Sequence, residues 1–195
     1  MNSNSLKKQM RMESILSSIS KFDYLTQAQI QEIHDLKSPR NANRVLNSMS
    51  EYLSSFRLGL EKVYYLNKNG RELVNNKVVR KKTPHVEHYL TRNQLWIHLR
   101  KPVEWQNEVK LKAGDFYIVC DAKTSQNGIP VFIEVDVSQS MQENKLKIEK
   151  YKQLMEITKQ KFYVVWVTKM DSRRKRISEL SQGLPGYIYT LGEII

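Results

Sequence analysis

Three carboxylate residues in the second half of the chain have the types and spacing to bind a metal ion. Asp115 stands at the start of one apolar segment, and Glu134 and Asp136 lie within the next, VFIEVDV. Alternate residues of a strand share one face, so Glu134 and Asp136 would project together. A hairpin between the two segments would bring Asp115 near Glu134. Because carboxylate oxygens bind hard cations, the pattern predicts that these three residues are catalytic and are ligands of Mg²⁺ or Mn²⁺.

Lysines that follow these carboxylates would supply the positive charge that phosphate chemistry needs. Lys145, Lys147 and Lys150 lie on a helix predicted over residues 142–158. If the site is active, Lys145 and Lys150 are its candidate catalytic cations. The alternative is that the acids pair with basic side chains such as Arg92 and Lys145 in an inactive fold, because buried carboxylates need a partner. The residues alone leave both interpretations open.

The elements that would position these residues alternate between helix and strand. Apolar periodicity predicts a helix and three strands, then a helix, a strand, a helix and a strand. An Asn-Gly turn at Asn127 and Gly128 separates the second and third strands. The predicted helices cover residues 84–99, 142–158 and 173–182, and the predicted strands cover residues 105–111, 116–120, 129–137, 162–168 and 187–190. This order indicates an α/β domain.

The first 80 residues carry signals for three helices, a hairpin and a closing helix. The first helix is predicted from apolar residues at helical spacing around residues 12–19. The later helices are predicted from their N-terminal residues. These signals are a capping box at Thr26 and Gln29, Ser38 followed by Pro39, and Asn67. Between the last two helices, residues 55–58 and 62–66 are predicted to be strands joined through Gly59.

The third predicted helix has an outward face typical of DNA recognition. Between residues 40 and 49 it contains neither Glu nor Lys, which usually dominate a solvated helix face. Arg pairs with guanine and Asn with adenine in the major groove, and a recognition helix presents such residues from its N-terminal turns. In the hairpin, Arg57 and Lys62 are predicted to lie near phosphates. The candidate base-contacting residues are Arg40, Asn41, Asn43, Arg44, Asn47 and Ser48. A plain solvated face is the alternative.

The charge of the chain favours a polyanionic partner. Lys and Arg number 32 against 20 Asp and Glu, giving a net charge of +12. Double-stranded DNA is the expected partner, because each neutralised phosphate releases condensed counterion. Residues 1–82 hold 15 of the basic and 7 of the acidic residues, so the excess is larger there than in the rest of the chain. A basic surface that merely aids solubility is the alternative.

Other features exclude several classes of protein. The apolar runs are far shorter than the roughly 18 residues that cross a bilayer, and the N-terminus lacks the apolar core of a secretory signal. A single cysteine, Cys120, excludes an internal disulfide and a multi-cysteine zinc site. We therefore expect no membrane partner, and a cytoplasmic, DNA-associated location.

These motifs resemble known families. The segment YYLNKNGRELV (residues 64–74) resembles the end of the wing in many winged-helix regulators. The strand order and the D…ExD pattern resemble the PD-(D/E)xK nuclease fold. From about residue 16 to residue 191 the chain resembles the plasmid replication-relaxation family. The residues that match the patterns of that family are His88, Asn93, Trp96, Ile97, Trp105, Glu108, Asp115, Glu134, Val135, Asp136, Lys150 and Tyr151.

The resemblance implies an α+β or α/β fold in two domains. A winged helix-turn-helix would cover residues 10–76, a basic linker residues 77–84, and a restriction-endonuclease-like, PD-(D/E)xK-like α/β domain residues 85–195. Asp136 stands where the nucleases have a lysine, which favours a nuclease-like fold without activity. Gly114 replaces the usual proline before Asp115.

The implied function is DNA binding in the replication of a plasmid or mobile element, in the control of that replication, or in DNA transfer. Replication or mobilisation proteins are the implied protein partners, and a homodimer on a palindromic site is one arrangement that winged helices adopt. Two alternatives stay open. One is a Mg²⁺-dependent endonuclease or nickase using Asp115, Glu134 and Asp136, and the other is a regulator of transcription.

Overall fold

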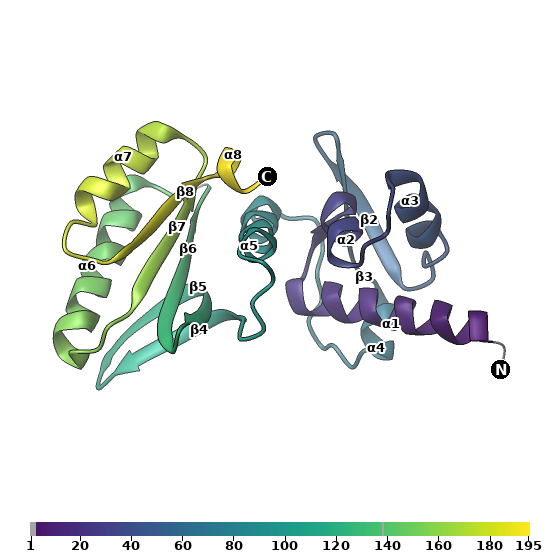
Figure 1. Ribbon diagram of the computed structural model, residues 1–195, viewed down its shortest axis with the longest axis horizontal. Coiled ribbons are helices and arrows are strands. Elements are labelled where there is room, and N and C mark those ends of the chain that lie inside the picture. Colours follow the sequence, from purple (N-terminus) through teal and green to yellow (C-terminus); the bar gives the residue numbers. More distant parts are fainter. Residues whose placement is uncertain (1–2, 138) are drawn as a thin grey trace. The chain divides into compact units, whose positions relative to one another are not determined.

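The structure is a computed structural model that describes residues 3–137 and 139–195. It combines helices with two β-sheets, and it divides into two compact units, Met1–Leu90 and Thr91–Ile195 (Figure 1). The division falls inside helix α5 (Val86–His98), so residues 77–84 belong to the first unit. No helix in the described part of the chain is both long enough and apolar enough to cross a bilayer.

After the first helix, the helices of the first unit begin at the predicted cap residues. Thr26 and Gln29 form both hydrogen bonds of the capping box, and the Ser38 hydroxyl accepts the Asn41 N–H at 3.3 Å. The Asn67 side chain accepts the Gly70 N–H at 3.0 Å. Gly70 has no room for a side chain, because a Cβ would overlap the carbonyl oxygen of Tyr52. The helices are α1 (Ser3–Phe22), α2 (Gln27–Ile33), α3 (Pro39–Asn47) and α4 (Lys68–Leu73).

The sheet of the first unit has three antiparallel strands in the order β1-β3-β2. The strands are β1 (Leu25–Thr26), β2 (Leu53–Leu58) and β3 (Glu61–Leu66). The β2–β3 hairpin turns through Gly59, whose φ of +58° suits a residue without a side chain. The short strand β1 was not predicted, because two residues carry no period that a sequence can show. Its pairing with β3 fixes the hairpin beside the start of α2.

Residues 77–84 are held against the first unit by specific contacts. The Tyr24 hydroxyl donates to the Lys81 carbonyl oxygen at 2.7 Å, and the Arg80 guanidinium forms an ion pair with Asp23 at 2.7 Å. The Tyr24 ring also lies within 6.5 Å of the rings of Phe56 and Tyr89, measured between centroids. This segment, predicted to be a linker, is therefore packed on an aromatic cluster.

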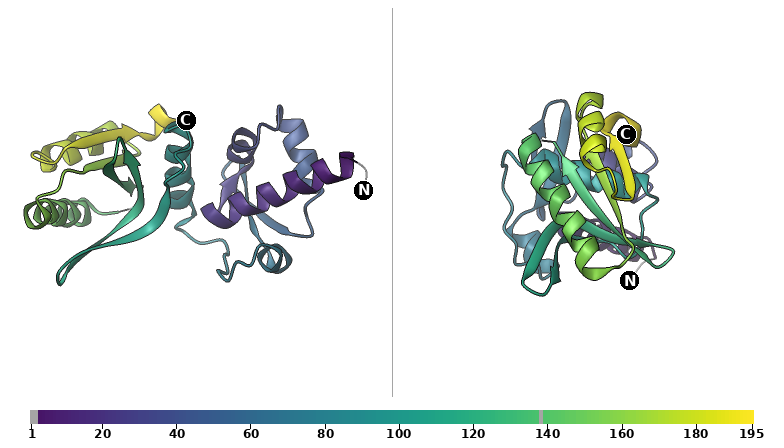
Figure 2. Two further views of the ribbon diagram at one scale, coloured as in Figure 1. Left: turned by 60° about the horizontal axis from the view of Figure 1, so that its bottom comes forward. Right: turned by 90° about the vertical axis from the view of Figure 1, so that its left-hand side faces the viewer.

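The second unit is a five-stranded sheet in the order β4-β5-β6-β7-β8. Strands β4, β5 and β6 pair antiparallel, whereas β6, β7 and β8 pair parallel. Helices α6 and α7 cover one face, and residues 91–98 of α5 lie on the other (Figure 2). The strands are β4 (Gln106–Ala113), β5 (Phe116–Gln126), β6 (Ile129–Asp136), β7 (Tyr163–Thr168) and β8 (Gly186–Thr190). The helices after α5 are α6 (Met141–Thr158), α7 (Asp171–Leu180) and α8 (Leu191–Ile194).

Two differences from the predicted elements have simple causes. Strand β5 continues through KTSQ to Gln126, because these four residues pair with β6 up to the Asn127–Gly128 turn despite their polar sequence. The predicted turn is confirmed, since Asn127 and Gly128 have φ of +52° and +76°. The last helix, α8, was not predicted, because it has only four residues.

Candidate nucleic-acid interface and buried carboxylates

The outward side chains of α3 form an exposed polar surface. Ala42 and Leu46 are buried and fix which side of the helix faces the core. The other side carries the six residues singled out from the sequence, and we call them the α3 surface. They are Arg40, Asn43, Arg44, Asn47 and Ser48, which are exposed, and Asn41, which is half-buried. Five of the residues from 38 to 47 line a shallow depression: Ser38, Arg40, Asn41, Arg44 and Asn47.

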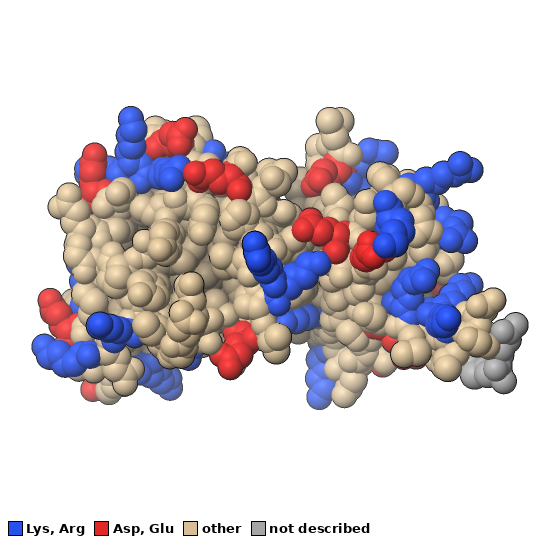
Figure 3. Space-filling model, in the orientation of Figure 1, with Lys and Arg blue, Asp and Glu red and all other residues tan. Residues whose placement is uncertain are grey.

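Local hydrogen bonds orient part of the α3 surface. The Asn41 amide donates to the Leu36 carbonyl oxygen at 2.8 Å, and the Arg44 guanidinium donates to the Asn41 side-chain oxygen at 2.8 Å. Arg44 is thus held by a neutral amide rather than by a carboxylate, and α3 contains no acidic residue. On one face of the first unit, Lys and Arg side chains gather over α3 and α1 (Figure 3). The α3 surface therefore keeps its positive charge available to an anion.

The β2–β3 hairpin places its two basic residues differently. The exposed Arg57 donates to the Leu60 carbonyl oxygen at 3.3 Å, next to the hairpin tip. Lys62 is half-buried, with its ammonium nitrogen 5.1 Å from the centroid of the Tyr64 ring. Arg57 is therefore better exposed to a phosphate than Lys62.

Asp115 does not join the other predicted carboxylates. It is exposed in the turn between β4 and β5, where Ala113 pairs with Phe116. The register of β5 against β6 pairs Ala122 with Ile133, so that Asp121 stands beside Glu134. Asp115 precedes Asp121 by six residues, which in a strand corresponds to about 20 Å. The hairpin expected to unite Asp115 with Glu134 thus brings Asp121 there instead.

Glu134 is fully buried and has a cation and a hydroxyl as partners. Tyr151 donates its hydroxyl to Glu134 at 2.5 Å, and Lys147 forms an ion pair with the same carboxylate. Asp121 accepts the backbone N–H of Val135 at 2.7 Å. We call Asp121, Glu134, Lys147 and Tyr151 the Glu134 cluster. Burial and the negative charge of Asp121 raise the pKa of Glu134 well above its usual value, against the opposing effects of Lys147 and Tyr151.

Asp136 is also fully buried, and both of its oxygens are hydrogen-bonded. Arg173 donates to it through two nitrogens, at 2.7 and 2.6 Å. The Asn144 amide and the Thr168 hydroxyl donate at 2.8 and 2.9 Å. We call these four residues the Asp136 cluster. Burial alone would raise the pKa of Asp136, but the hydrogen bonds from Arg173, Asn144 and Thr168 outweigh it, so the pKa lies below its usual value.

Lys145 and Lys150 lie away from both clusters. Lys145 is exposed and pairs with Glu149 at 3.9 Å, and the Lys150 ammonium is 5.7 Å from the centroid of the Tyr117 ring. The lysine that reaches Glu134 is Lys147. The helical period contains the signal for this, because residues three and four apart share a face and Lys147 is four residues before the buried Tyr151.

The residues predicted to bind a metal do not fit a shared divalent ion. Glu134 and Asp136 have basic side chains as partners, and Asp115 is at a distant turn. Within the described residues, no group of three or more His, Cys, Asp and Glu side chains could hold a metal ion. The cations that neutralise the acids are Lys147 and Arg173, not the Arg92 and Lys145 proposed from the sequence. Cys120 is buried beside the Glu134 cluster, and burial raises the pKa of its thiol to about 12.

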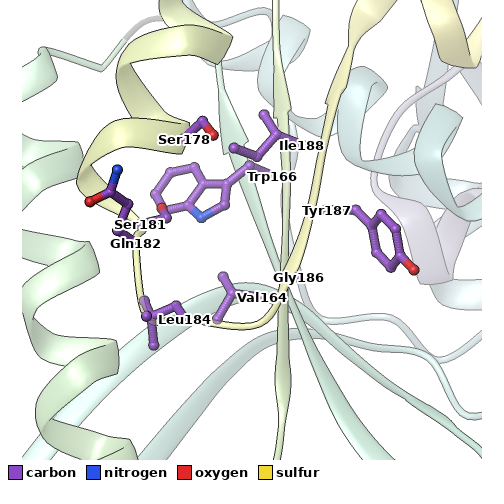
Figure 4. Close-up of a pocket in the computed structure, with 10 residues that line it drawn as sticks. Val164, Trp166, Ser178, Ser181, Gln182, Leu184, Gly186, Tyr187 and Ile188 are labelled. Atoms are coloured by element: carbon purple, nitrogen blue, oxygen red, sulfur yellow. The ribbon is translucent and has the colours of Figure 1, made fainter.

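A separate pocket of about 270 Å³ lies between β7, α7 and β8. Figure 4 shows the Trp166 ring beside Ser181, with Leu184 and Val164 below it. None of the described side chains that line it is charged. The pocket therefore lacks the cations that would bind phosphate.

Comparisons with known proteins identify the family. A family model described as replication-relaxation matches residues 16–165, which is more than half of the chain. Among solved structures, the chain is similar to the crystal structure of protein VC1899 from Vibrio cholerae, with 15% sequence identity and a TM-score of 0.39. That match covers 98% of this chain and 50% of the other, so the chain spans half the length of that protein. The comparison with curated proteins found no match. On the family match, which confirms the resemblance found in the sequence, the chain belongs to the replication-relaxation family.

Proposed function

We propose that this protein binds duplex DNA and acts in the replication of a plasmid or similar mobile element, in the control of that replication, or in DNA transfer. Membership of the replication-relaxation family supports the replication context. The observation that carries the DNA-binding part is the α3 surface, an exposed helix face of Arg and Asn side chains without an acidic residue. A net charge of +12 fits the same kind of partner.

We propose that the first unit is a winged helix-turn-helix. Its elements run α1, β1, α2, α3, β2, β3, α4, and the strands pair in the order β1-β3-β2. Helix α3 follows α2 after a short connection, as a recognition helix does, and the β2–β3 hairpin takes the place of the wing. Aligned beside the major groove, α3 would present its N-terminal turns to base edges while the hairpin contacts the backbone.

The proposed roles of the side chains follow from their donors and acceptors. Arg40 and Arg44 pair with guanine through two parallel hydrogen bonds, and Asn43 and Asn47 pair with adenine. Asn41 orients Arg44 through their 2.8 Å hydrogen bond. Arg57 contacts phosphate, which contributes affinity without sequence information.

We propose that the second unit is a nuclease-like α/β domain that holds further DNA or a partner protein. Its order of one helix, three antiparallel strands, a helix and a parallel strand supports this assignment. The nuclease alternative needs Asp115, Glu134 and Asp136 at one cation, and the positions of these residues do not favour it. DNA binding through the first unit is therefore the function that the structure supports best.

The test is sequence-specific binding by an Arg44→Ala variant. A preferred duplex is selected from a random pool with the full chain, and affinities are measured by fluorescence anisotropy at fixed salt. Loss of a paired contact to guanine weakens binding to the selected duplex by about 1–3 kcal/mol, roughly 5- to 150-fold. Arg176→Ala, which removes the same charge from the exposed side of α7 in the second unit, is the control and leaves the preference for the selected duplex over unrelated duplexes unchanged.

Two results would contradict the proposal. An equal loss on selected and unrelated duplexes would show that Arg44 contacts only phosphate, so that α3 does not discriminate bases. No complex with any duplex, even at low salt, would remove the proposed function itself.

A further inference from the structure

We infer that Asp121 and Glu134 form a cation site which the ammonium group of Lys147 occupies, so that the second unit carries its own cation where a divalent ion could otherwise bind. This inference goes beyond the proposed function, since it concerns the second unit alone and involves no DNA. It replaces the site predicted from Asp115, Glu134 and Asp136.

The two carboxylates meet because of strand register rather than sequence proximity. Pairing of Ala122 with Ile133 sets β5 against β6, and Asp121 accepts the Val135 N–H at 2.7 Å, one residue from Glu134. Asp121 and Glu134 interact strongly enough for the charge of Asp121 to contribute to the raised pKa of Glu134. Two acids are thus placed together beside the apolar core of the second unit.

Lys147 reaches this pair from α6. It forms an ion pair with Glu134, and the charges of both Glu134 and Asp121 raise its pKa despite burial. Its side chain is 21% exposed while that of Glu134 is 0% exposed, so Lys147 closes the cluster toward solvent. Because the lysine is tethered to the helix, it is present at the carboxylates at a high effective concentration, and a dissolved ion has to displace it.

The Asp136 cluster shows why the inferred cation site is confined to Glu134. Arg173 binds Asp136 through two nitrogens, and Asn144 and Thr168 supply the remaining hydrogen bonds. Both oxygens of Asp136 thus accept hydrogen bonds, two of them from a single guanidinium, whose paired donors suit a carboxylate. In the Glu134 cluster the cation is a single ammonium that pairs with Glu134 and also feels the charge of Asp121. A divalent ion could take its place between two carboxylates.

The experiment removes the ammonium and offers Mn²⁺ in its place. Binding of Mn²⁺ to the full chain is measured by electron paramagnetic resonance, and thermal unfolding is recorded with MnCl₂ against NaCl of equal ionic strength. We expect Lys147→Ala to bind one Mn²⁺ at least tenfold more tightly than the unaltered protein does, and to regain thermal stability with Mn²⁺. The unaltered protein is expected to show no such stabilisation.

Two variants make the result specific. Lys145→Ala removes a lysine from the exposed side of the same helix and is expected to behave as the unaltered protein does. Adding Glu134→Gln to Lys147→Ala is expected to abolish Mn²⁺ binding. Should Lys147→Ala fail to fold, Lys147→Met, which keeps most of the volume, takes its place.

Either of two outcomes overturns the inference. A folded Lys147 variant that binds Mn²⁺ no better than the unaltered protein would show that Asp121 and Glu134 do not form a cation site. Tight Mn²⁺ binding by the unaltered protein that Glu134→Gln abolishes would show that Lys147 does not occupy the site. A failure of the unaltered protein to bind any duplex, by contrast, would contradict only the proposed function and would leave the inference about Lys147 unaffected.

Discussion

The α3 surface and the carboxylates of β6 were both singled out by residue type, and the structure treats them in opposite ways. On α3, Arg40 and Arg44 are exposed and no acidic residue shares the helix. On β6, Glu134 and Asp136 are fully buried beside Lys147 and Arg173. Charged groups whose partners lie inside the fold stabilise it, whereas those without a charged partner remain available for binding. The comparison shows that the position of the opposite charge decides whether a charged side chain stabilises the fold or is available to bind a partner.

The largest expected effect is on the buried side of this comparison. Arg173→Met leaves Asp136 buried without its guanidinium, and removing one partner of a buried pair lowers the free energy of unfolding by about 3–5 kcal/mol. Urea denaturation followed by tryptophan fluorescence measures this loss in the second unit, because Trp96, Trp105 and Trp166 all lie there.

The control lies on the same helix. Arg176 pairs with Glu179 at 2.8 Å, but both side chains are more than half exposed. Exposed ion pairs contribute little, so Arg176→Met is expected to change stability by less than about 1 kcal/mol. Equal effects of the two substitutions would show that the Asp136 cluster is not a buried structural pair, and the contrast between the two regions would fail.

The parts of the fold that could be predicted from the sequence are those fixed by local chemistry. Caps at Thr26, Ser38 and Asn67 depend on hydrogen bonds within three residues, and each is confirmed. The Asn127–Gly128 turn depends on two residues that accept positive φ, and it too is confirmed. Most strand and helix limits fell within two residues of the structure for the same reason. The short elements β1 and α8 were not predicted, because two and four residues are too few to show a period.

The carboxylate site was harder to predict, because register is not a local property. Asp115 and Asp121 stand on either side of the strand predicted over residues 116–120, and only the pairing of Ala122 with Ile133 decides which one stands beside Glu134. The approach of Lys147 to the buried carboxylates could have been predicted from the sequence, since Lys147 shares a helical face with Tyr151. The exposure of the α3 residues could be predicted from the amphipathic period, except that Asn41 is half-buried, and their contacts with DNA stay a prediction.

A smaller effect concerns pH, and it separates the two carboxylates of β6. The pKa of Glu134 is raised in the folded protein, so between the ordinary value of 4.5 and the raised one the folded state binds more protons than the unfolded state. The free energy of unfolding therefore falls as pH rises through this window, by at most about 1.4 kcal/mol per pH unit. Glu134→Gln abolishes that decline, and urea titrations from pH 4.5 to pH 8 measure it.

Asp136→Asn is the matched comparison, because Asp136 stands on the same strand and face. The pKa of Asp136 is lowered from 3.8, so its stabilisation is complete above that pH and is lost only as pH falls through the lowered value. Asp136→Asn therefore leaves the slope above pH 4.5 unchanged. A stability difference between the unaltered protein and Glu134→Gln that rose with pH would contradict this prediction. It would mean that the ion pair with Lys147 lowers the pKa of Glu134 by more than burial and the charge of Asp121 raise it.

The smallest expected effect lies on the exposed side, in the β2–β3 hairpin. Arg57 is exposed beside the tip, and among the described residues its side chain donates to the Leu60 carbonyl oxygen alone, so the guanidinium keeps donors for a phosphate. A phosphate contact carries no sequence information, and each one contributes about 0.9 to the slope of log affinity against log salt concentration. Arg57→Ala should therefore weaken selected and unrelated duplexes equally, with a salt slope reduced by about 1. Lys62→Ala, at a half-buried position, should reduce it less. A loss of affinity confined to the selected duplex would show that Arg57 contacts bases. The hairpin would then contribute to sequence recognition together with α3.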